Sequence, residues 1–228
     1  MIVSLRARSR SSAPTCRKMA PRLGSRLLAW RGGPLPPDVR AEQLMGMPQT
    51  AEMWTADQIR ALPDDGLRHE VVDGEHLVTP APRAPHQIAI SELEAVLRPY
   101  VRQHRLGRVI FSPADLELDP HTMVQPDLFV TRETRVRSWK DALPLRLAIE
   151  VLSPSTARAD RLVKRRRFQR AAIEFWIVDL KARLVERWRP GDKRPEVAGL
   201  RLEWQPEPAL PRLVLDLAAF FREVHAED

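Results

Sequence analysis

One apolar run in the sequence contains a single carboxylate: Leu147-Ala148-Ile149-Glu150-Val151-Leu152. An apolar run of this length is typical of a central β-strand that is covered on both faces. A carboxylate in such a strand is costly to bury unless it pairs with a cation or binds a metal. Glu150 is therefore a candidate functional residue, and the alternative is a glutamate at the exposed end of a strand.

A second carboxylate, Asp127, interrupts the apolar run at residues 125–130. Pro126 indicates a strand start, a bulge or an edge, although a Pro-Asp pair on its own is usually a turn. If Asp127 and Glu150 lie on neighbouring strands, they could share Mg²⁺, which prefers one or two carboxylates plus water and phosphate oxygens. A metal held in this way lowers the pKa of a bound water and offsets charge on phosphorus, which is the chemistry of phosphodiester cleavage.

Lys164 is the third candidate, because it is one of only five lysines among 37 basic residues and lies in a run of arginines. Asp160 precedes it by four residues, so one interpretation is an ion pair within a helix. The functional interpretation is that Lys164 holds the attacking water or the phosphate as a compact positive charge.

The segment around Lys164 is strongly basic, and residues 157–172 are predicted to form a helix. Such a helix is either a solvated charged face or a surface whose guanidinium groups contact backbone phosphates. The candidate nucleic-acid contacts are Arg158, Arg161, Arg165, Arg166 and Arg167, with Arg170 following in the same segment.

The net charge of +7 comes entirely from the first fifty residues, because residues 51–228 contain 28 basic and 28 acidic side chains. The Arg-, Ser- and Pro-rich composition predicts a disordered basic extension over residues 1–50, followed by a folded domain over 51–228. This composition is similar to that of an organellar transit peptide. The alternative is a later translation start at Met45, Met47 or Met53.

No stretch resembles a secretory signal or approaches the ~20 apolar residues of a membrane span. The single cysteine, Cys16, excludes an internal disulfide and a Cys-rich zinc site, and the six histidines show no paired metal-ligand spacing. These observations predict a protein of the reducing cytoplasm.

The rest of the pattern predicts a mixed α/β domain. Thr55 to Gln58 has the form of a capping box, which predicts a short helix to about Leu62. Asp73-Gly74 between two short runs predicts a β-hairpin of residues 69–72 and 76–79. A core-facing helix is predicted from Pro85 onward by apolar residues at helical spacing: Leu93, Val96, Leu97, Tyr100 and Val101. Further strands are predicted at residues 109–112, 116–118, 128–131, 145–152, 175–178 and 184–188, the last as an edge strand, before a short amphipathic C-terminal segment.

These elements resemble the Uma-type endonuclease family, within the restriction-endonuclease-like, PD-(D/E)XK nuclease superfamily. The resemblance covers residues 53–222 and rests on motifs that occur in the family's order. They are Leu62-Pro63-Asp64-Asp65-Gly66-Leu67-Arg68-His69-Glu70-Val71-Val72-Asp73-Gly74-Glu75, Pro80-Ala81-Pro82 with His86, Pro126-Asp127, Glu150-Val-Leu-Ser-Pro-Ser-Thr156, Lys164, Phe175-Trp176-Ile177-Val178-Asp179, and Leu210-Pro211 to Phe220.

The resemblance implies a mixed β-sheet flanked by α-helices, in which Asp127 and Glu150 bind the divalent metal and Glu70 is a further acidic member of the site. It also implies that Lys164 replaces the superfamily's usual lysine, because the position two residues after Glu150 is Leu152. Two other departures are His69 in place of the family's usual tyrosine and the lack of a proline after Ile173.

The leading hypothesis is a Mg²⁺-dependent endonuclease that hydrolyses DNA, with Mn²⁺ as a possible substitute metal and Lys164 positioning or activating the attacking water. The first alternative is a nucleic-acid-binding or partner-binding protein on the same fold that has lost catalysis. The second is a nuclease subunit that acts only with a partner, tethered by its basic tail. The predicted partner is DNA, a membrane is not expected, and a homodimer is compatible with the sequence.

Overall fold

A computed structural model describes residues 53–153 and 157–226 of the chain. The predicted disordered extension, residues 1–50 with Cys16, Met45 and Met47, lies outside the described residues, as does the Pro-Ser-Thr part of the motif that begins at Glu150. Within the described ranges, no helix is both long and apolar enough to cross a membrane.

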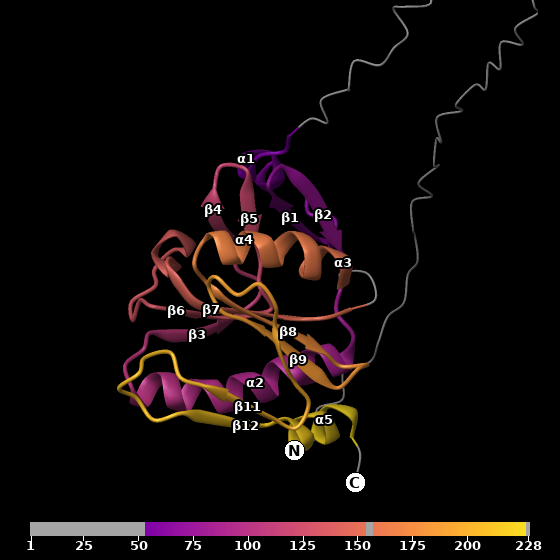
Figure 1. Cartoon of the computed structure of the whole chain (residues 1–228). Helices are drawn as coiled ribbons and strands as arrows, with labels where there is room; N and C mark the ends of the chain where they lie inside the picture. Colours follow the sequence, from indigo (N-terminus) through magenta and orange to yellow (C-terminus); the bar gives the residue numbers. More distant parts are fainter. Residues whose placement is uncertain (1–52, 154–156, 227–228) are drawn as a thin grey trace, which may run out of the picture. The chain divides into compact units, whose positions relative to one another are not determined.

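The first unit of the fold is a four-stranded antiparallel sheet in the order β2-β1-β5-β4 (Figure 1). It comprises β1 (Arg68–Val72), β2 (Glu75–Thr79), β4 (Leu116–Asp119) and β5 (Thr122–Val124). The hairpin β1–β2 was predicted, and its turn residues Asp73 and Gly74 adopt positive φ angles of 51° and 82°. The sequence pattern missed β5, which is only three residues long. The predicted capping box is confirmed, because Thr55 and Gln58 cap the short helix α1 (Ala56–Arg60) reciprocally.

The second unit is a six-stranded mixed sheet in the order β10-β9-β8-β7-β6-β3. It comprises β3 (Arg108–Phe111), β6 (Leu128–Thr131), β7 (Leu145–Val151), β8 (Glu174–Asp179), β9 (Leu184–Trp188) and β10 (Glu196–Ala198). Strands β7 and β8 are parallel and all other neighbours are antiparallel. The prediction that residues 184–188 form an edge strand is wrong, because the three-residue strand β10 pairs with β9 and becomes the edge.

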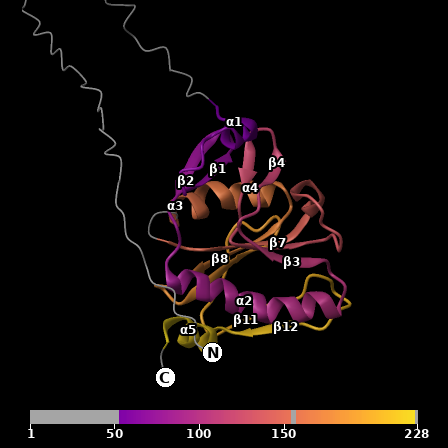
Figure 2. The same cartoon turned by 180° about the vertical axis from the view of Figure 1, so that it is seen from behind.

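Two hydrophobic cores cover the two faces of this sheet. Helix α2 (Ala84–Gln103) packs on one face together with α5 (Leu217–His225) and the hairpin of β11 (Arg201–Trp204) and β12 (Leu213–Asp216). Helix α4 (Arg165–Arg170) packs on the other face through the buried Phe168. Figures 1 and 2 show α2 on one side of the sheet and α4 on the other. Val96, predicted to face the core, is 40% exposed because α2 buries only the stripe on its sheet side.

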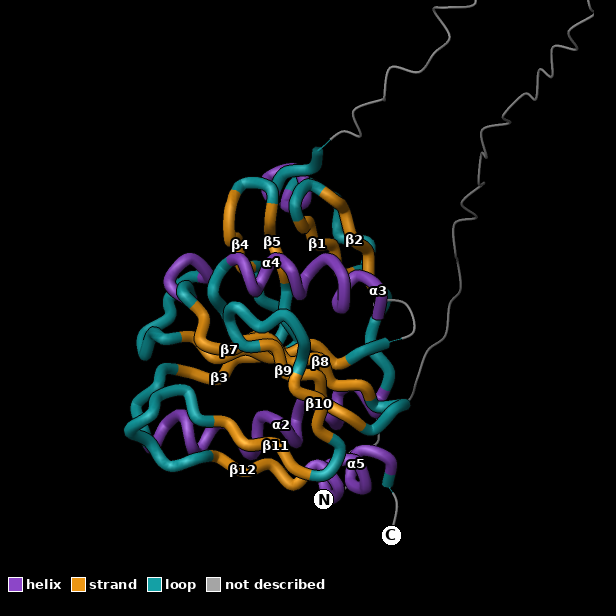
Figure 3. Tube along the Cα trace, in the orientation of Figure 1, coloured by secondary structure: helices purple, strands orange, loops and turns teal. Residues whose placement is uncertain are grey.

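The predicted helix of residues 157–172 consists of three pieces. A short α-helical turn, α3 (Ala157–Ala159), leads into a π-helical segment, η3 (Asp160–Lys164), and then into α4. Figure 3 traces α3 and α4 along the face of the sheet. A π-helical segment inside a helix is rare and is frequent at functional sites. Here it places both Asp160 and Lys164 in the interior. A single 3-10 turn, η2 (Trp139–Ala142), precedes β7.

Candidate active site

Glu150 and Asp127 come together at the centre of the six-stranded sheet. Strand β7 lies between β6 and β8, so Glu150 is on a central strand, and only 1% of it is exposed. Asp127 directly precedes β6, whose Leu128 is paired with Ile149. The Asp127 carboxylate accepts a hydrogen bond of 2.9 Å from the backbone N–H of Val151. The predicted neighbourhood of the two carboxylates is therefore confirmed, and the alternative of an exposed strand end for Glu150 is wrong.

Glu70 reaches this site from the other sheet. It lies on β1, is fully buried, and accepts a hydrogen bond of 2.7 Å from the backbone N–H of Gln125 through Oε1. Gln125 is two residues before Asp127, so this bond ties β1 to the segment that carries the second carboxylate. The four-stranded sheet thus contributes an acid to a site built on the six-stranded sheet.

Lys164 bridges the two sheets. Its ammonium donates to Glu70 Oε2 at 2.8 Å and to Glu150 Oε1 at 2.9 Å, and it lies 3.5 Å from Asp160 Oδ1. The ion pair with Asp160 and the contact with the candidate acids therefore coexist. Burial alone would lower the pKa of Lys164, but the charges of the surrounding carboxylates outweigh it and raise that pKa. The ammonium consequently stays protonated.

Two further residues that the sequence reasoning did not assign to the site hold Asp127. Arg68 Nη1 lies 2.8 Å from Asp127 Oδ1, and His86 Nε2 lies 3.1 Å from Oδ2. Burial would raise the pKa of Asp127, but its hydrogen bond to His86 and the nearby charges lower that pKa below the usual range. The spacing Arg68-x-Glu70 was the available signal, because alternate residues of a strand share one face. His86 lies on α2, and no local pattern links it to Asp127.

The charge of this buried cluster, defined as Arg68, Glu70, Asp127, Glu150, Asp160 and Lys164, is unbalanced. Four carboxylates face two permanent cations, which leaves a net charge of −2 when all six are ionised. Burial, together with the neighbouring carboxylates, raises the pKa of Glu150 well above its usual value despite the opposing effect of Lys164. A divalent cation would remove the imbalance without requiring a proton.

The donor set fits a hard divalent cation, because it offers carboxylate oxygens on two paired strands. Within residues 53–153 and 157–226, no three His, Cys, Asp or Glu side chains converge as a complete metal cage. Mg²⁺ does not require one, since it is usually held by one or two carboxylates and keeps several waters. Asp127 and Glu150, on adjacent parts of the sheet, would supply these two carboxylates.

A cleft of about 970 Å³ opens beside the cluster and includes Asp127, Arg68 and His86 in its wall. Leu152, which occupies the position of the superfamily's usual lysine, also lines it. Asp127 is thus the point at which the buried cluster meets a space large enough for a substrate.

The basic helical segment makes more intramolecular contacts than a solvated face would. Arg161 pairs with Asp179 and Glu186, both at 2.8 Å. Other arginines of the segment are also engaged, Arg167 with Asp119, Arg170 with Asp73, and Arg165 over the ring of Trp188 at 4.4 Å. Arg158 and Arg166 are exposed and form no ion pair within the described residues. Of the predicted nucleic-acid contacts, these two guanidinium groups are the most accessible to a phosphate.

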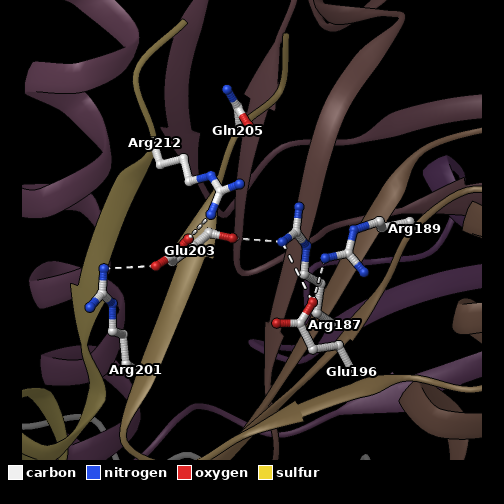
Figure 4. A pocket seen from close by; sticks show the side chains of 7 residues that line it. All are labelled: Arg187, Arg189, Glu196, Arg201, Glu203, Gln205 and Arg212. Carbon is white, nitrogen blue, oxygen red and sulfur yellow. Dashed lines mark hydrogen bonds and ion pairs between the residues drawn. The ribbon is translucent and has the colours of Figure 1, made fainter. Parts of the chain in front are cut away.

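A second hollow, of about 510 Å³, is lined by the residues of Figure 4: Arg187, Arg189, Glu196, Arg201, Glu203, Gln205 and Arg212. Arg187 and Val185 lie on the same face of β9, and Val185 packs in the core that α2 covers. Glu150 faces the other core, which contains Phe168 of α4. This surface network therefore lies on the opposite face of the six-stranded sheet from Glu150.

The fold is similar to that of a solved structure. The structure matches a crystal structure described as that "of a putative nuclease belonging to DUF820 from Anabaena variabilis ATCC 29413". The TM-score is 0.59 and the sequence identity is 20%, over 75% of this chain and 99% of that chain. The chain therefore has the mixed, helix-flanked sheet of a nuclease fold, as predicted.

The match to a sequence family identifies the chain more specifically than the match of the fold. The model of the Uma2 family, described as "Putative restriction endonuclease", matches residues 56–218. The chain belongs to this family, and the resemblance noted from its motifs is confirmed. No curated protein matches the chain.

Proposed function

We propose that the protein is an endonuclease that hydrolyses phosphodiester bonds of DNA with Mg²⁺, for which Mn²⁺ can substitute. The observation that carries the proposal is the convergence of Asp127, Glu150 and Lys164, with Lys164 Nζ 2.9 Å from Glu150 Oε1. Family membership supports the nuclease class. We further propose that residues 51–228 form the catalytic domain and that the protein acts in the cytoplasm.

Asp127 and Glu150 would hold the metal, and Glu70 would support the site through Lys164. A bound divalent cation would supply a water of lowered pKa and would offset the charge that develops on the phosphate. His86 and Arg68 keep the Asp127 carboxylate ionised and oriented through contacts of 3.1 Å and 2.8 Å.

Lys164 would act as a hydrogen-bond donor rather than a general base, because its raised pKa keeps the ammonium protonated. A fixed positive charge at this point orients the attacking water and stabilises negative charge in the transition state. Glu70 and Glu150 hold the ammonium from two sides, so its position is set before substrate binds. Outside this cluster, we propose that Arg158 and Arg166 contact DNA phosphates, with Arg161, Arg165 and Arg167 contributing if their present partners release them.

The test is cleavage of supercoiled plasmid by the full chain with Mg²⁺, comparing wild type with Asp127→Asn, Glu150→Gln and Lys164→Met. Glu203→Gln, on the opposite face of the sheet, is the matched control. We expect losses of about 100-fold or more in the three site variants, since single electrostatic contributors to a transition state have effects of this size. The control should cleave like wild type.

Isothermal titration of Mg²⁺ into the same proteins separates the residues that bind the metal from those that contribute to cleavage in another way. Binding should be lost in Asp127→Asn and Glu150→Gln. Wild-type protein that binds DNA but neither Mg²⁺ nor Mn²⁺, and does not cleave, would favour the alternative of a catalytically inactive nucleic-acid-binding protein on this fold. Cleavage that is unchanged in the carboxylate variants would refute the metal assignment.

A further inference from the structure

The wall of the cleft beside Asp127 is mainly apolar, which is unusual for a surface that meets a polyanion. Its apolar residues come from the loop before β1, the segment before and into α2, and the strand ends around the site. They include Leu67, Pro82, Ile90, Phe111, Leu152 and Leu180. The cleft volume of about 970 Å³ lies within the range of roughly 300–1,000 Å³ that is typical of pockets enclosing small molecules.

Phe111 is the most informative member of this wall. It ends the edge strand β3, is 53% exposed, and is paired with Leu128, the residue that follows Asp127. The next residue, Ser112, donates its backbone N–H to the carbonyl of Asp127 at 3.1 Å. An exposed aromatic ring is therefore anchored by backbone hydrogen bonds next to the carboxylate proposed to act on the phosphate.

Cations are few in this cleft and lie beside the apolar wall. Arg68 is already held by Asp127, which leaves Arg83 and Lys181 as the other permanently cationic lining residues. A double helix presents its phosphates outward and keeps its bases stacked inside, so it offers little to an apolar wall. An unpaired nucleotide offers a base whose flat face stacks on an aromatic side chain, next to a phosphate that a few cations can meet.

We propose that the cleft binds an unpaired nucleotide, with its base against Phe111 and its phosphate toward Asp127, so that the substrate is single-stranded nucleic acid or an unpaired segment within a duplex. This inference rests on the nuclease function proposed above and specifies its substrate class. The apolar wall contributes base contacts, and Arg83 and Lys181 contribute to the backbone contacts. Sequence preference is expected to be weak, because every base has a face that can stack.

The experiment measures binding separately from cleavage. Fluorescence anisotropy of the full chain, in EDTA, compares a labelled single-stranded oligonucleotide with a hairpin duplex of the same length and label. We expect the single strand to bind more tightly. Phe111→Ala should weaken single-strand binding by on the order of 10-fold, the loss expected for one base-stacking contact. Phe111→Trp should retain it.

Trp139→Ala is the matched control, because Trp139 is an aromatic residue that is 40% exposed and does not line the cleft. It should leave the affinity unchanged. Equal affinities for single strand and duplex, or an unchanged affinity in Phe111→Ala, would overturn the inference. A wild-type dimer in size-exclusion chromatography that Phe111→Ala converts to monomer, without a change in single-strand affinity, would instead assign the wall to a second copy of the chain.

The outcomes for the two proposals are distinguishable. If the protein cleaves DNA with Mg²⁺ but binds single strand and duplex equally, the nuclease function stands and the inference fails. If single-strand binding depends on Phe111 but no metal-dependent cleavage occurs on any substrate, the cleft assignment stands and the catalytic function fails.

Discussion

Two charged networks lie on opposite faces of the same sheet and differ in burial. The buried cluster around Lys164 has four carboxylates against the two permanent cations Arg68 and Lys164, and its carboxylates and lysine are at most 2% exposed. The surface network of Figure 4 has four arginines against Glu196 and Glu203, and three of these arginines have side chains between 45% and 64% exposed. Both networks contain well-formed ion pairs. Glu203, for example, accepts from Arg201 and Arg212 at 2.7 Å each.

The comparison shows that the geometry of an ion pair does not by itself indicate how much the pair contributes to stability. An exposed pair gains about 0–1 kcal/mol because water already solvates each partner. A buried charge that loses its partner has no water to replace it, so breaking such a pair costs about 3–5 kcal/mol. The stability of the fold therefore depends on the charges of the buried cluster more than on those of the surface network. Because the buried cluster has more carboxylates than cations, a bound divalent cation should stabilise it.

The largest expected effect is the loss of the cation that joins the two sheets. Lys164→Met leaves Glu70 and Glu150 buried without their common partner, and it should reduce the free energy of unfolding by about 3–5 kcal/mol. Denaturation in urea, followed by circular dichroism, measures the change. Lys193→Met, at an exposed lysine, is the control and should be nearly neutral. A loss below about 1 kcal/mol in Lys164→Met would place the cluster in the same class as a surface pair.

The second effect is stabilisation by metal. A cation that binds only the folded state should raise the free energy of unfolding by about 2.7 kcal/mol at a concentration 100 times its dissociation constant. Differential scanning calorimetry with and without Mg²⁺ should show a higher melting temperature for wild type and no change for Asp127→Asn. An equal rise in both proteins would show that the cation binds elsewhere.

A smaller effect is expected in the surface network. Arg212→Ala removes one of the two arginines that hold Glu203, and it should change the free energy of unfolding by about 0–1 kcal/mol. The difference from wild type should shrink further in 1 M NaCl, because salt screens exposed charges. Urea denaturation at low and high salt measures both. A loss comparable to that of Lys164→Met would remove the distinction between the two networks.

The smallest effect is a pH dependence of the same network. Hydrogen bonding to Arg212 and the nearby arginine charges lower the pKa of Glu203 below its ordinary value. A lowered pKa means that the contribution to stability is present above the ordinary value near 4.5 and is lost as the pH falls below it. Melting temperatures between pH 6 and pH 3 should therefore fall slightly less steeply in Glu203→Gln than in wild type. A steeper fall in the variant would contradict the assigned direction.

Local sequence patterns predicted much of the fold correctly where the controlling interactions are near in the chain. The capping box at Thr55 and the turn at Asp73-Gly74 depend on residues within four positions, and both formed as predicted. The patterns missed β5, β10 and β11, which are three, three and four residues long, because such short strands are stabilised by their neighbours rather than by their own sequence. Because β10 was missed, β9 was wrongly predicted to be the edge strand.

The sequence alone determined that Glu150 would lie in a strand and favoured a central, buried one, because the residues around it are apolar. It also indicated Asp127 and Lys164 as the companions of Glu150. The tertiary structure decided how these charges are satisfied, by bringing Glu70 from another sheet, Lys164 from a π-helical segment, and Arg68 and His86 onto Asp127. Burial is encoded in local hydrophobicity, whereas the partner of a buried charge is set by contacts between residues distant in the chain.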